Sequence, residues 1–442
     1  MSLPSAGMSA SSLASSFDNR LHWAREQDAA DELSSLRQCF ALPRDAQGRE
    51  LLYFCGHSLG LAPVAARAVV LKEIDNWEQL AVAAHDAADP SWIGYAESIQ
   101  QPLAQLAGAL VHEVVAMNSL SVNLHLLLAS FYRPTGERRR ILIEKGAFPS
   151  DRHVVTSQIA WHGGNPATDL VEVEARAGED SIRCEDLQAR IAQEAGRLAV
   201  VLWPGVQYLT GQLFQAAPIA RAAHAVGAIA GFDLAHAIGN VPLALHADEA
   251  DFAVWCSYKY LNAGPGAVGG AYVHERHLQR PEFPRLTGWW GHDAVSRFDM
   301  PPDFRPAAGA RAWAISNPPI FSTAPLRASL PLFMQAGMPS LRAKSRALTA
   351  YLESLVMELA GTHLQLVTTA DAEQRGCQLS LRLKRGAEHG REVFHSLSAR
   401  GIVSDWREPN IIRLAPVPLY NSFEDVLRCA WQLADVLAGA RS

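Results

Sequence analysis

"RLAVVLWPGVQYLTGQLFQAAPIARAAHAVGAIAGFD", residues 197–233, predicts the fold class. Its first seven residues are a continuous apolar run, as expected of a strand that is buried on both faces. Pro218 then suits the first turn of a helix, and Gly227 suits the cap at its C-terminal end. Residues 228–233 predict a second strand. Strand, helix and strand in this order form a βαβ unit, which implies parallel strands joined by a right-handed crossover.

Similar apolar runs flank this unit and predict further strands of the same sheet. They lie at residues 140–144, 251–256 and 270–274. Because strands and helices alternate, we expect a large α/β domain over residues 51–320, with a mostly parallel sheet sandwiched by helices.

The pattern changes after the Pro-Pro pair at residues 318–319. Residues 341–359 have helical periodicity, residues 377–383 alternate like a half-buried strand, and residues 391–401 predict a helix that ends at a glycine. We therefore expect a separate, smaller α+β domain over residues 321–442.

From the composition of the N-terminal segment we expect no targeting signal there. Residues 1–16, "MSLPSAGMSASSLASS", lack the basic start and apolar centre of a secretory signal peptide, so we expect a disordered leader. Residues 17–50 predict a helical segment that packs with the small domain. No run of about 18 apolar residues is present that could span a membrane. These features predict a cytoplasmic protein.

Composition and charge argue against several classes of partner. A hydrophobic content of 49% and a charged content of 19% are typical of a globular protein, and a net charge of −6 disfavours nucleic acid and anionic membranes as partners. The six cysteines have no C-x-x-C spacing, which disfavours both a disulfide framework and a zinc site. "HERH", residues 274–277, has two histidines three residues apart, but nothing nearby in the sequence completes a ligand set. We expect surface histidines there and no metal site.

"GHSLG", residues 56–60, matches the nucleophile-elbow pattern of serine hydrolases at Ser58. That elbow joins a central strand directly to a helix, so several strands should precede it. Only one strand candidate does so here. Pro63 follows five residues after Ser58, where it would cost about 3 kcal/mol inside the elbow helix. We expect a loop at Ser58 and a helix that opens at Pro63, and we reject the hydrolase interpretation.

An aspartate and a lysine carry the strongest chemical signal. Asp233 ends one predicted strand, and Lys259 follows another by three residues. Ligands of open α/β sheets bind outside the carboxyl ends of the strands, so both side chains should face one crevice. Pyridoxal phosphate needs this pair: the lysine forms a Schiff base with it, and the carboxylate keeps its pyridine nitrogen protonated. A surface lysine and a helix-capping aspartate are the alternative for each residue taken alone.

Longer motifs around these residues resemble the kynureninases, which are fold-type-I pyridoxal-phosphate enzymes. The resemblance covers nearly the whole chain, from "YFCGHSLGL" to "RLAPVPLYNSFEDV", with "DLAHAIGN", "WCSYKYLNAG", "GWWGH" and "ISNPPI" as specific matches between them. It implies the fold-type-I architecture and the pyridoxal 5'-phosphate cofactor.

The resemblance also implies which residues bind the cofactor. In "MNSLSVNLH", Leu120 and Ser121 would hold the phosphate at a helix N-terminus. In "AFPSD", the ring of Phe148 would stack on the cofactor, and the carboxylate of Asp151 would lie near its reactive side. The two residues between them, Pro149 and Ser150, would also bind the cofactor. Asp233 would pair with the pyridine nitrogen, and His236 would lie beside the cofactor. Tyr258 would contact the phosphate and act as acid and base on the substrate carbonyl.

By the same resemblance, a second subunit completes each site. Trp289 and Asn317 would enter the partner's site, which implies a homodimer with shared active sites. Four residues of the chain would bind the substrate, namely Ser58, His85, Asn317 and Arg413. Arg413 would hold the substrate α-carboxylate through bidentate hydrogen bonds.

Two positions depart from the family's pattern. His57 stands where the family usually has asparagine. Pro204 stands where close relatives carry a serine that contacts the cofactor, and proline offers neither a hydroxyl nor an N–H.

The activity implied is the hydrolysis of L-kynurenine or 3-hydroxy-L-kynurenine to an anthranilate and L-alanine, in tryptophan catabolism or NAD biosynthesis. Another fold-type-I activity, such as a desulfurase or aminotransferase, is one alternative. A desulfurase needs a catalytic cysteine on a mobile loop, and no such cysteine is evident in the sequence. A non-catalytic protein that keeps the cofactor pocket is the other alternative, and the presence of Lys259, Asp233, Tyr258 and Arg413 disfavours it.

Overall fold

The computed structural model describes residues 10–278, 280 and 283–439 of the chain. It divides into two compact units. The larger comprises residues 56–339 and 367–376, and the smaller comprises the described residues up to 55 together with 340–366 and 377–439. Residues 1–9 of the expected leader lie outside the described residues. From Ala10 the chain is helical, because α1 spans Ala10–Ala30.

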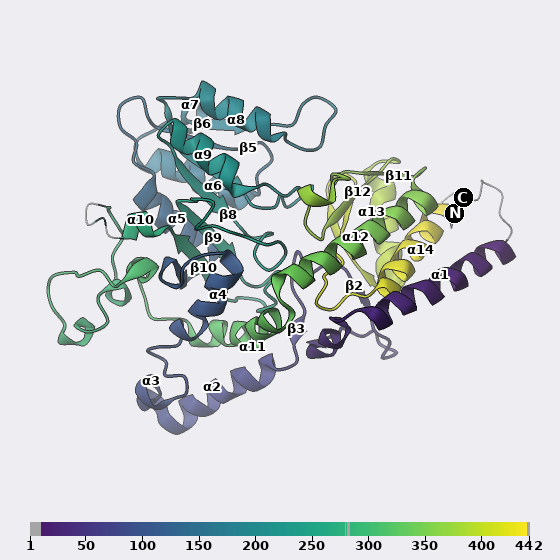
Figure 1. Ribbon diagram of the computed structural model, residues 1–442, viewed down its shortest axis with the longest axis horizontal. Helices are drawn as coiled ribbons and strands as arrows, with labels where there is room; N and C mark the ends of the chain where they lie inside the picture. Colours follow the sequence, from purple (N-terminus) through teal and green to yellow (C-terminus); the bar gives the residue numbers. More distant parts are fainter. Residues whose placement is uncertain (1–9, 279, 281–282, 440–442) are drawn as a thin grey trace. The chain divides into compact units, whose positions relative to one another are not determined.

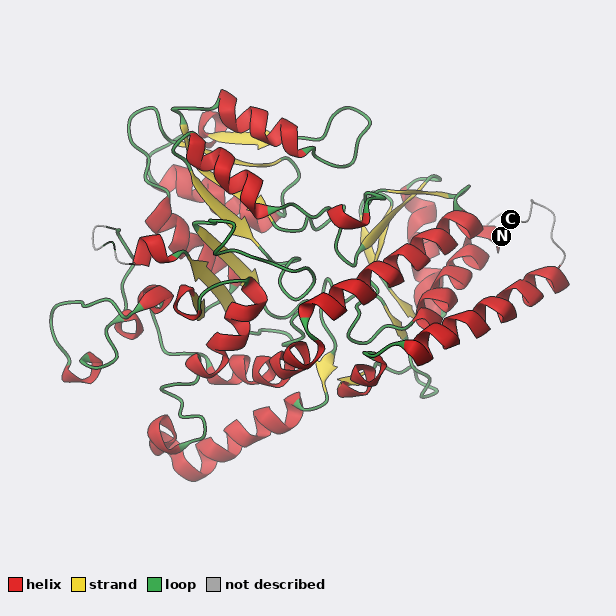
Figure 2. Ribbon diagram, viewed as in Figure 1, coloured by secondary structure: helices red, strands yellow, loops and turns green. Residues whose placement is uncertain are grey.

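The larger unit is built on a mixed sheet with helices packed against it (Figures 1 and 2). Within the described ranges its seven strands have the order β4-β10-β9-β8-β7-β5-β6. The strands from β6 to β9 pair in parallel, whereas β10 pairs antiparallel with both β9 and β4 at one edge. The mostly parallel sheet predicted from the sequence is therefore confirmed. The strands are β4 (Val114–Ala116), β5 (Arg140–Glu144), β6 (Leu170–Val173), β7 (Leu198–Pro204), β8 (Ile229–Asp233), β9 (Phe252–Cys256) and β10 (Gly269–Val273).

The βαβ unit predicted from residues 197–233 is present as β7, α9 and β8. Helix α9 spans Ala216–Ala225 and packs on β8, so it begins two residues before Pro218. Gly227 follows the helix with φ +73°, a conformation that glycine adopts without strain. The last residues of β7 and β8, Pro204 and Asp233, are direct partners in the parallel ladder. This register brings two strand ends to one edge of the sheet.

Burial explains why these segments are strands and not amphipathic helices. Every residue of β9 and β10 is buried, and so are Leu198–Trp203 of β7. Helix α5 (Leu120–Phe131) packs against β9 and β10, and α6 (Pro149–Trp161) packs against α5. Apolar side chains from these helices and strands share one core. A sheet covered by such helices needs continuous apolar runs, which is the pattern seen in the sequence.

One predicted helix start is wrong. Helix α2 spans Ala66–Leu80, and Pro63 lies three residues earlier in the short strand β3 (Ala62–Pro63). The fixed φ of proline suits an extended segment as well as a first helical turn, so the residue type alone did not distinguish them. The remaining helices of this unit are α3 (Ala84–Ala87), α4 (Gln100–Ala107), α7 (Pro166–Asp169), α8 (Cys184–Gln193), α10 (Glu275–Leu278) and α11 (Ile320–Ala336).

The smaller unit is an α+β structure. Its antiparallel sheet has the order β11-β12-β15-β14, and β2 pairs in parallel with β13. Helix α1 packs against α14, and α14 packs against α13. The strand expected over residues 377–383 and the helix expected over 341–359 are both present. The elements are β1 (Phe40–Ala41), β2 (Leu52–Tyr53), α12 (Met338–Ala360), β11 (Leu364–Leu366), β12 (Leu379–Leu383), α13 (Ala387–Ala399), β13 (Ile402–Val403), β14 (Asp405–Arg407), β15 (Ile411–Leu414) and α14 (Phe423–Gly439).

In the part of the chain that the structure describes, no helix is both long enough and apolar enough to cross a membrane.

Candidate active site

A cavity of about 160 Å³ lies at the carboxyl ends of the parallel strands of the larger unit. The last residues of four strands line it, namely Glu144 of β5, Pro204 of β7, Asp233 of β8 and Cys256 of β9. The structure also brings nine predicted site residues to this cavity: Leu120, Ser121, Phe148, Ser150, Asp151, Asp233, His236, Tyr258 and Lys259. The prediction that Asp233 and Lys259 face one crevice is confirmed.

Lys259 is held in this cavity by a histidine. Its Nζ lies 3.1 Å from Nε2 of His236, and both side chains are buried. Phe148 presents its ring 5.6 Å from the same Nζ, and the ring of Tyr258 is 5.7 Å from it. A buried lysine with one hydrogen-bond partner and two aromatic neighbours is positioned for reaction, because its side chain is ordered where a ligand would enter.

Asp233 and Asp151 form a pair of buried carboxyl groups. Asp233 accepts a hydrogen bond of 2.6 Å from the N–H of Ala235, and burial raises its pKa above the ordinary value. Asp151 lies in the first turn of α6, where burial and then the charge of Asp233 hold its pKa well above the ordinary range. Because like charges on the two buried carboxyl groups oppose each other, a proton on one of them is favoured.

Asp151 Oδ1 is also buried, and it has no hydrogen-bond partner among the described residues. A cationic N–H bound by Asp233 would offset the charge of the pair beside this oxygen. The protonated ring nitrogen of pyridoxal phosphate is such a group, so the two acids fit the cofactor.

The cavity also contains groups that suit an anion. Ser121 lies in the first turn of α5, a helix of 12 residues, and its Oγ is 2.6 Å from Oγ of Ser150. The backbone of β10 approaches this helix start closely, since a Cβ on Gly269 would lie 3.1 Å from the N atom of Leu120. Free N–H groups at a helix start, together with two hydroxyls, are suited to hold a phosphate.

Tyr258 keeps its proton in this environment. Burial, followed by the neighbouring Cys256, raises the pKa of Tyr258 above its ordinary value. Burial likewise raises the pKa of the Cys256 thiol to about 11. At neutral pH the cavity therefore offers a phenol that can donate a hydrogen bond, and a thiol that is not a nucleophile.

Several predicted residues of the larger unit do not line this cavity. Pro149 begins α6, and His85 Nδ1 lies 3.0 Å from the carbonyl oxygen of Val82. Trp289 is 43% exposed and donates to the carbonyl of Arg297, whereas Asn317 is exposed beside a separate small cavity. Ser58 is half-buried. The roles predicted for these residues stay predictions.

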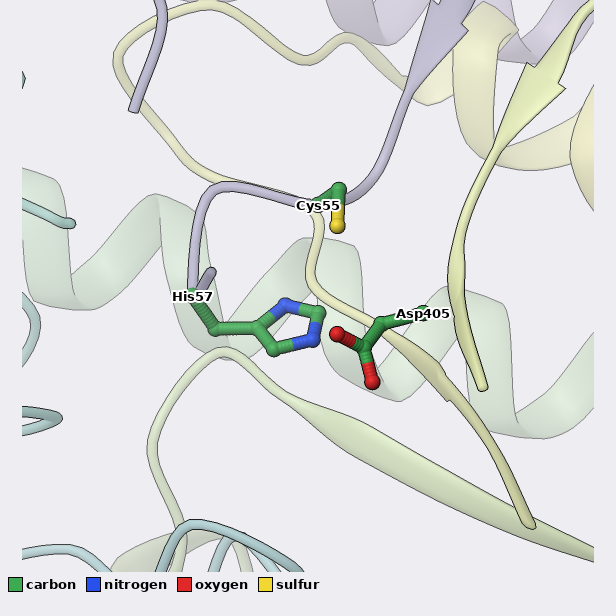
Figure 3. A group of neighbouring side chains, drawn as sticks. All are labelled: Cys55, His57 and Asp405. Carbon is green, nitrogen blue, oxygen red and sulfur yellow. The ribbon is translucent and has the colours of Figure 1, made fainter. Parts of the chain in front are cut away.

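Arg413 belongs to the smaller unit and is 1% exposed. Its Nε and Nη2 lie 2.9 and 2.8 Å from Oδ1 of Asp405. Cys55 of the same unit lies beside Asp405, with the sulfur within 4.8 Å of the carboxylate (Figure 3). Figure 3 also draws His57, which follows Cys55 by two residues and belongs to the larger unit. The guanidinium of Arg413 is thus ordered by a carboxylate of its own unit, and its role as a substrate clamp stays a prediction.

Sequence reasoning did not assign several residues that line the cavity. Tyr208 packs edge-on against Phe148, with ring centroids 5.2 Å apart. Glu144 is 3% exposed and accepts a hydrogen bond from Gln207. The available signal for Glu144 was its place at the end of a predicted strand, the same signal that identified Asp233. Pro204 also lines the cavity, where its ring supplies an apolar wall and no hydroxyl.

The prediction of surface histidines in "HERH" is wrong. His274 and His277 are both buried. His277 Nε2 lies 2.7 Å from Oδ1 of Asp251. His274 lies beside Glu113 and His246, with one ring nitrogen of each histidine and one carboxylate oxygen within 4.8 Å of one another. Their partners come from distant parts of the sequence, so local spacing did not reveal them.

Comparisons with known proteins identify relatives of this chain. A family model described as "Kynureninase C-terminal domain" matches residues 341–433. A protein named kynureninase from Xanthomonas campestris pv. campestris (strain B100) is 55% identical over 399 residues, which is 90% of this chain and 94% of the relative. One of the same name from Xanthomonas axonopodis pv. citri (strain 306) is 54% identical over 408 residues, covering 92% and 96%.

Solved structures of lower identity share the fold. A C-DES variant with glycine covalently linked to its PLP cofactor has a TM-score of 0.74 at 18% identity, over 87% of this chain and 96% of that one. The apo cysteine desulfurase from Thermococcus onnurineus NA1 has a TM-score of 0.72 at 17% identity, over 92% and 98%. The fold-type-I architecture expected from the sequence is confirmed.

Proposed function

This chain belongs to the kynureninase family, and from that premise we propose that the cavity of its larger unit is the active site. The reaction is the pyridoxal-phosphate-dependent hydrolysis of L-kynurenine, or its 3-hydroxy form, to the corresponding anthranilate and L-alanine. The observation that carries this proposal is the convergence of Lys259, the two acids Asp233 and Asp151, and the hydroxyl-lined start of α5 on one cavity.

Bound pyridoxal phosphate supplies an aldehyde that links to amines and a ring that accepts electrons. Ser121, with the backbone of Leu120, would hold its phosphate, and Phe148 would cover one face of its ring. Asp233 would bind the ring nitrogen, with Asp151 beside it. Each assignment matches a charge or a surface that the cavity already presents.

Lys259 has two tasks in this proposal. Its amine would hold the cofactor through the aldehyde, and the same amine, when free, would remove the Cα proton of the substrate. His236, at 3.1 Å, orients the amine for both steps.

Tyr258 acts on the substrate ketone. Because burial favours its neutral form, the phenol can donate a proton to the carbonyl oxygen as water adds to the carbonyl carbon, Cγ. The Cβ–Cγ bond then breaks. The anthranilate leaves with an oxygen from water, and the alanyl fragment is protonated and released.

The substrate contacts and the assembly are parts of the proposal that rest on the family. Arg413 would bind the α-carboxylate, and Ser58, His85 and Asn317 would surround the aromatic ring. Trp289 and Asn317 would enter the site of a second copy, so that the working enzyme is a homodimer in the cytoplasm. The exposure of both side chains is consistent with a role at such an interface.

A desulfurase activity is the alternative that the structural neighbours raise. Among the described residues, Cys256 is the cysteine that lines the cavity. It is buried at the end of β9, and its thiol pKa of about 11 opposes the thiolate that a desulfurase needs. This observation favours the kynureninase reaction.

The test is turnover of L-kynurenine by the purified protein loaded with cofactor, followed by anthranilate fluorescence and by alanine analysis. We expect the wild type and Cys256→Ala each to release anthranilate and alanine in equal amounts, and Lys259→Ala to release neither. Release of sulfide from cysteine without anthranilate from kynurenine would overturn the proposal.

A further inference from the structure

Glu144 is a buried acid of the cavity to which the proposed reaction gives no task. It is the last residue of β5 and lines the cavity together with Asp151 and Asp233. Strand β5 neighbours β7, and the last residue of β7, Pro204, pairs with Asp233 of β8. Three adjacent strand ends therefore bring Glu144 and Asp233 to the same enclosed space.

Gln207 holds one oxygen of Glu144 in a defined way. The Oε1 atom of Gln207 accepts the N–H groups of Leu209 at 2.5 Å and Thr210 at 2.7 Å, which fixes the orientation of the amide. Its Nε2 consequently faces Glu144 and donates to Oε1 at 3.3 Å. This hydrogen bond favours the ionised form of Glu144, but the donor is neutral and its effect is smaller than that of burial, which favours the neutral acid.

The cavity cannot hold all its acids as carboxylates. Three buried carboxyl groups face one lysine, and like charges in such a space oppose one another's ionisation. Asp233 has the N–H of Ala235 and the charge of Lys259 to stabilise its carboxylate. Glu144 forms no ion pair within the described ranges, and burial, followed by the charge of Asp233, raises its pKa to about 8. The other titratable groups that line the cavity are Asp151, His236, Cys256 and Tyr258.

We propose that Glu144 is a positioning residue of the cofactor cavity, which works as a neutral carboxylic acid and so leaves Asp233 as the carboxylate that faces the cofactor ring. Loss of the Glu144 proton in alkaline solution adds a negative charge to the cavity. Pyridoxal phosphate is itself an anion, and the added charge also disfavours the ionised form of Asp233, so cofactor retention weakens. The inference rests on the proposed function in that the cavity binds this cofactor.

The first test measures the Kd of pyridoxal phosphate for the full-length protein as a function of pH. Glu144→Gln keeps the shape of a neutral acid and cannot ionise. We expect its Kd to match that of the wild type within about twofold at pH 7. Above about pH 8 the wild-type Kd should rise relative to that of Glu144→Gln, by up to about tenfold per pH unit. Glu174→Gln, which removes an exposed carboxylate just after β6, should follow the wild type at every pH.

A tenfold weaker Kd of Glu144→Gln already at pH 7, or a ratio to the wild type that does not change with pH, would overturn the proposal. A second measurement does not depend on the folding of the variant. With glutamate labelled by carbon-13 at the side-chain carboxyl, the infrared C=O band of a protonated glutamic acid is distinguished from that of aspartic acid. We expect such a band in the wild type at pH 7 and its loss by about pH 9. Its absence at pH 7 would contradict a neutral Glu144.

Neither measurement uses kynurenine. A protein that shows this titration but leaves kynurenine intact would refute the proposed function and retain the role of Glu144. A protein that cleaves kynurenine with an ionised Glu144 at pH 7 would support the proposed function and refute the role of Glu144.

Discussion

Nζ of Lys259 lies 3.1 Å from Nε2 of His236, and both residues line the same cavity as Asp233, the last residue of β8. This contact orders the amine at the point where the cofactor aldehyde would bind. We therefore expect different effects from substituting Lys259 and from substituting His236.

Lys259→Ala should abolish turnover, with a kcat lower by at least about 10³-fold, because both the covalent link to the cofactor and the base are lost. Borohydride reduction should attach cofactor to the wild type and not to the variant, as read by mass spectrometry of the peptides. Cofactor fixed covalently to Lys259→Ala would show that another residue forms the link.

His236→Phe should weaken cofactor binding by about 3- to 10-fold, the value of one buried hydrogen bond, while the covalent link to Lys259 still forms. The Kd from fluorescence titration and the borohydride adduct together check this. Unchanged affinity would mean that the contact at 3.1 Å does not position the amine.

Activity should require two copies of the chain, because Trp289 and Asn317 are proposed to act in the partner's site. Mixing inactive Lys259→Ala with inactive Asn317→Ala should restore up to about a quarter of wild-type sites, since random exchange makes half of the dimers mixed and each has one intact site. Isotope-labelled subunits establish that exchange has occurred. No recovery after proven exchange excludes a shared site.

Asp251→Asn should destabilise the fold at neutral pH, and progressively less as the pH falls below about 4. Burial alone would raise the pKa of Asp251, but hydrogen bonds from His224 and His277 outweigh it and hold that pKa below the ordinary value. A lowered pKa in the folded state stabilises the protein fully above the unfolded value of about 4, and this contribution decreases as the pH falls from there through the lower folded-state pKa. Thermal unfolding of both proteins between about pH 7 and pH 2 measures the effect. The exposed Glu249→Gln is the matched control, and a difference in Tm between the wild type and Asp251→Asn that stays constant with pH would contradict the account.

The substrate pocket should accept a hydroxyl beside the aniline nitrogen. Ser58, His85 and Asn317 are polar, and polar groups buried by a ring without the hydroxyl would cost about 1–3 kcal/mol each unless water bridges them. We expect a higher kcat/KM for 3-hydroxykynurenine than for kynurenine, and a loss of that preference in His85→Phe combined with Asn317→Thr. A preference for kynurenine that those substitutions leave unchanged would show that these residues do not contact the ring.

The sequence predicted those features that depend on neighbours along the chain or on strand ends. Continuous apolar runs identified β5, β7, β8, β9 and β10, and the rule that ligands bind at carboxyl ends of parallel strands placed Asp233 and Lys259 in one cavity. Glu144 obeys the same rule. It was not assigned because nothing in the sequence shows that its side chain is buried beside two other acids.

Features that depend on distant partners could not be predicted. His274 and His277 appeared to be surface residues because the carboxylates that hold them, Glu113 and Asp251, come from other parts of the chain. The start of α2 was misplaced because Pro63 suits both an extended segment and a first helical turn. In both cases the residue type was compatible with two environments, and tertiary packing decided between them.

The origin of the carboxylate oxygen in the product tests the central claim most directly. Hydrolysis at the γ-ketone transfers an oxygen atom from water to anthranilate. In water enriched in oxygen-18, we expect the cofactor-loaded wild type to release anthranilate with one labelled carboxylate oxygen, together with an equal amount of alanine, and Lys259→Ala to release neither. Consumption of kynurenine without labelled anthranilate and alanine, as in transfer of its amino group, would contradict the account.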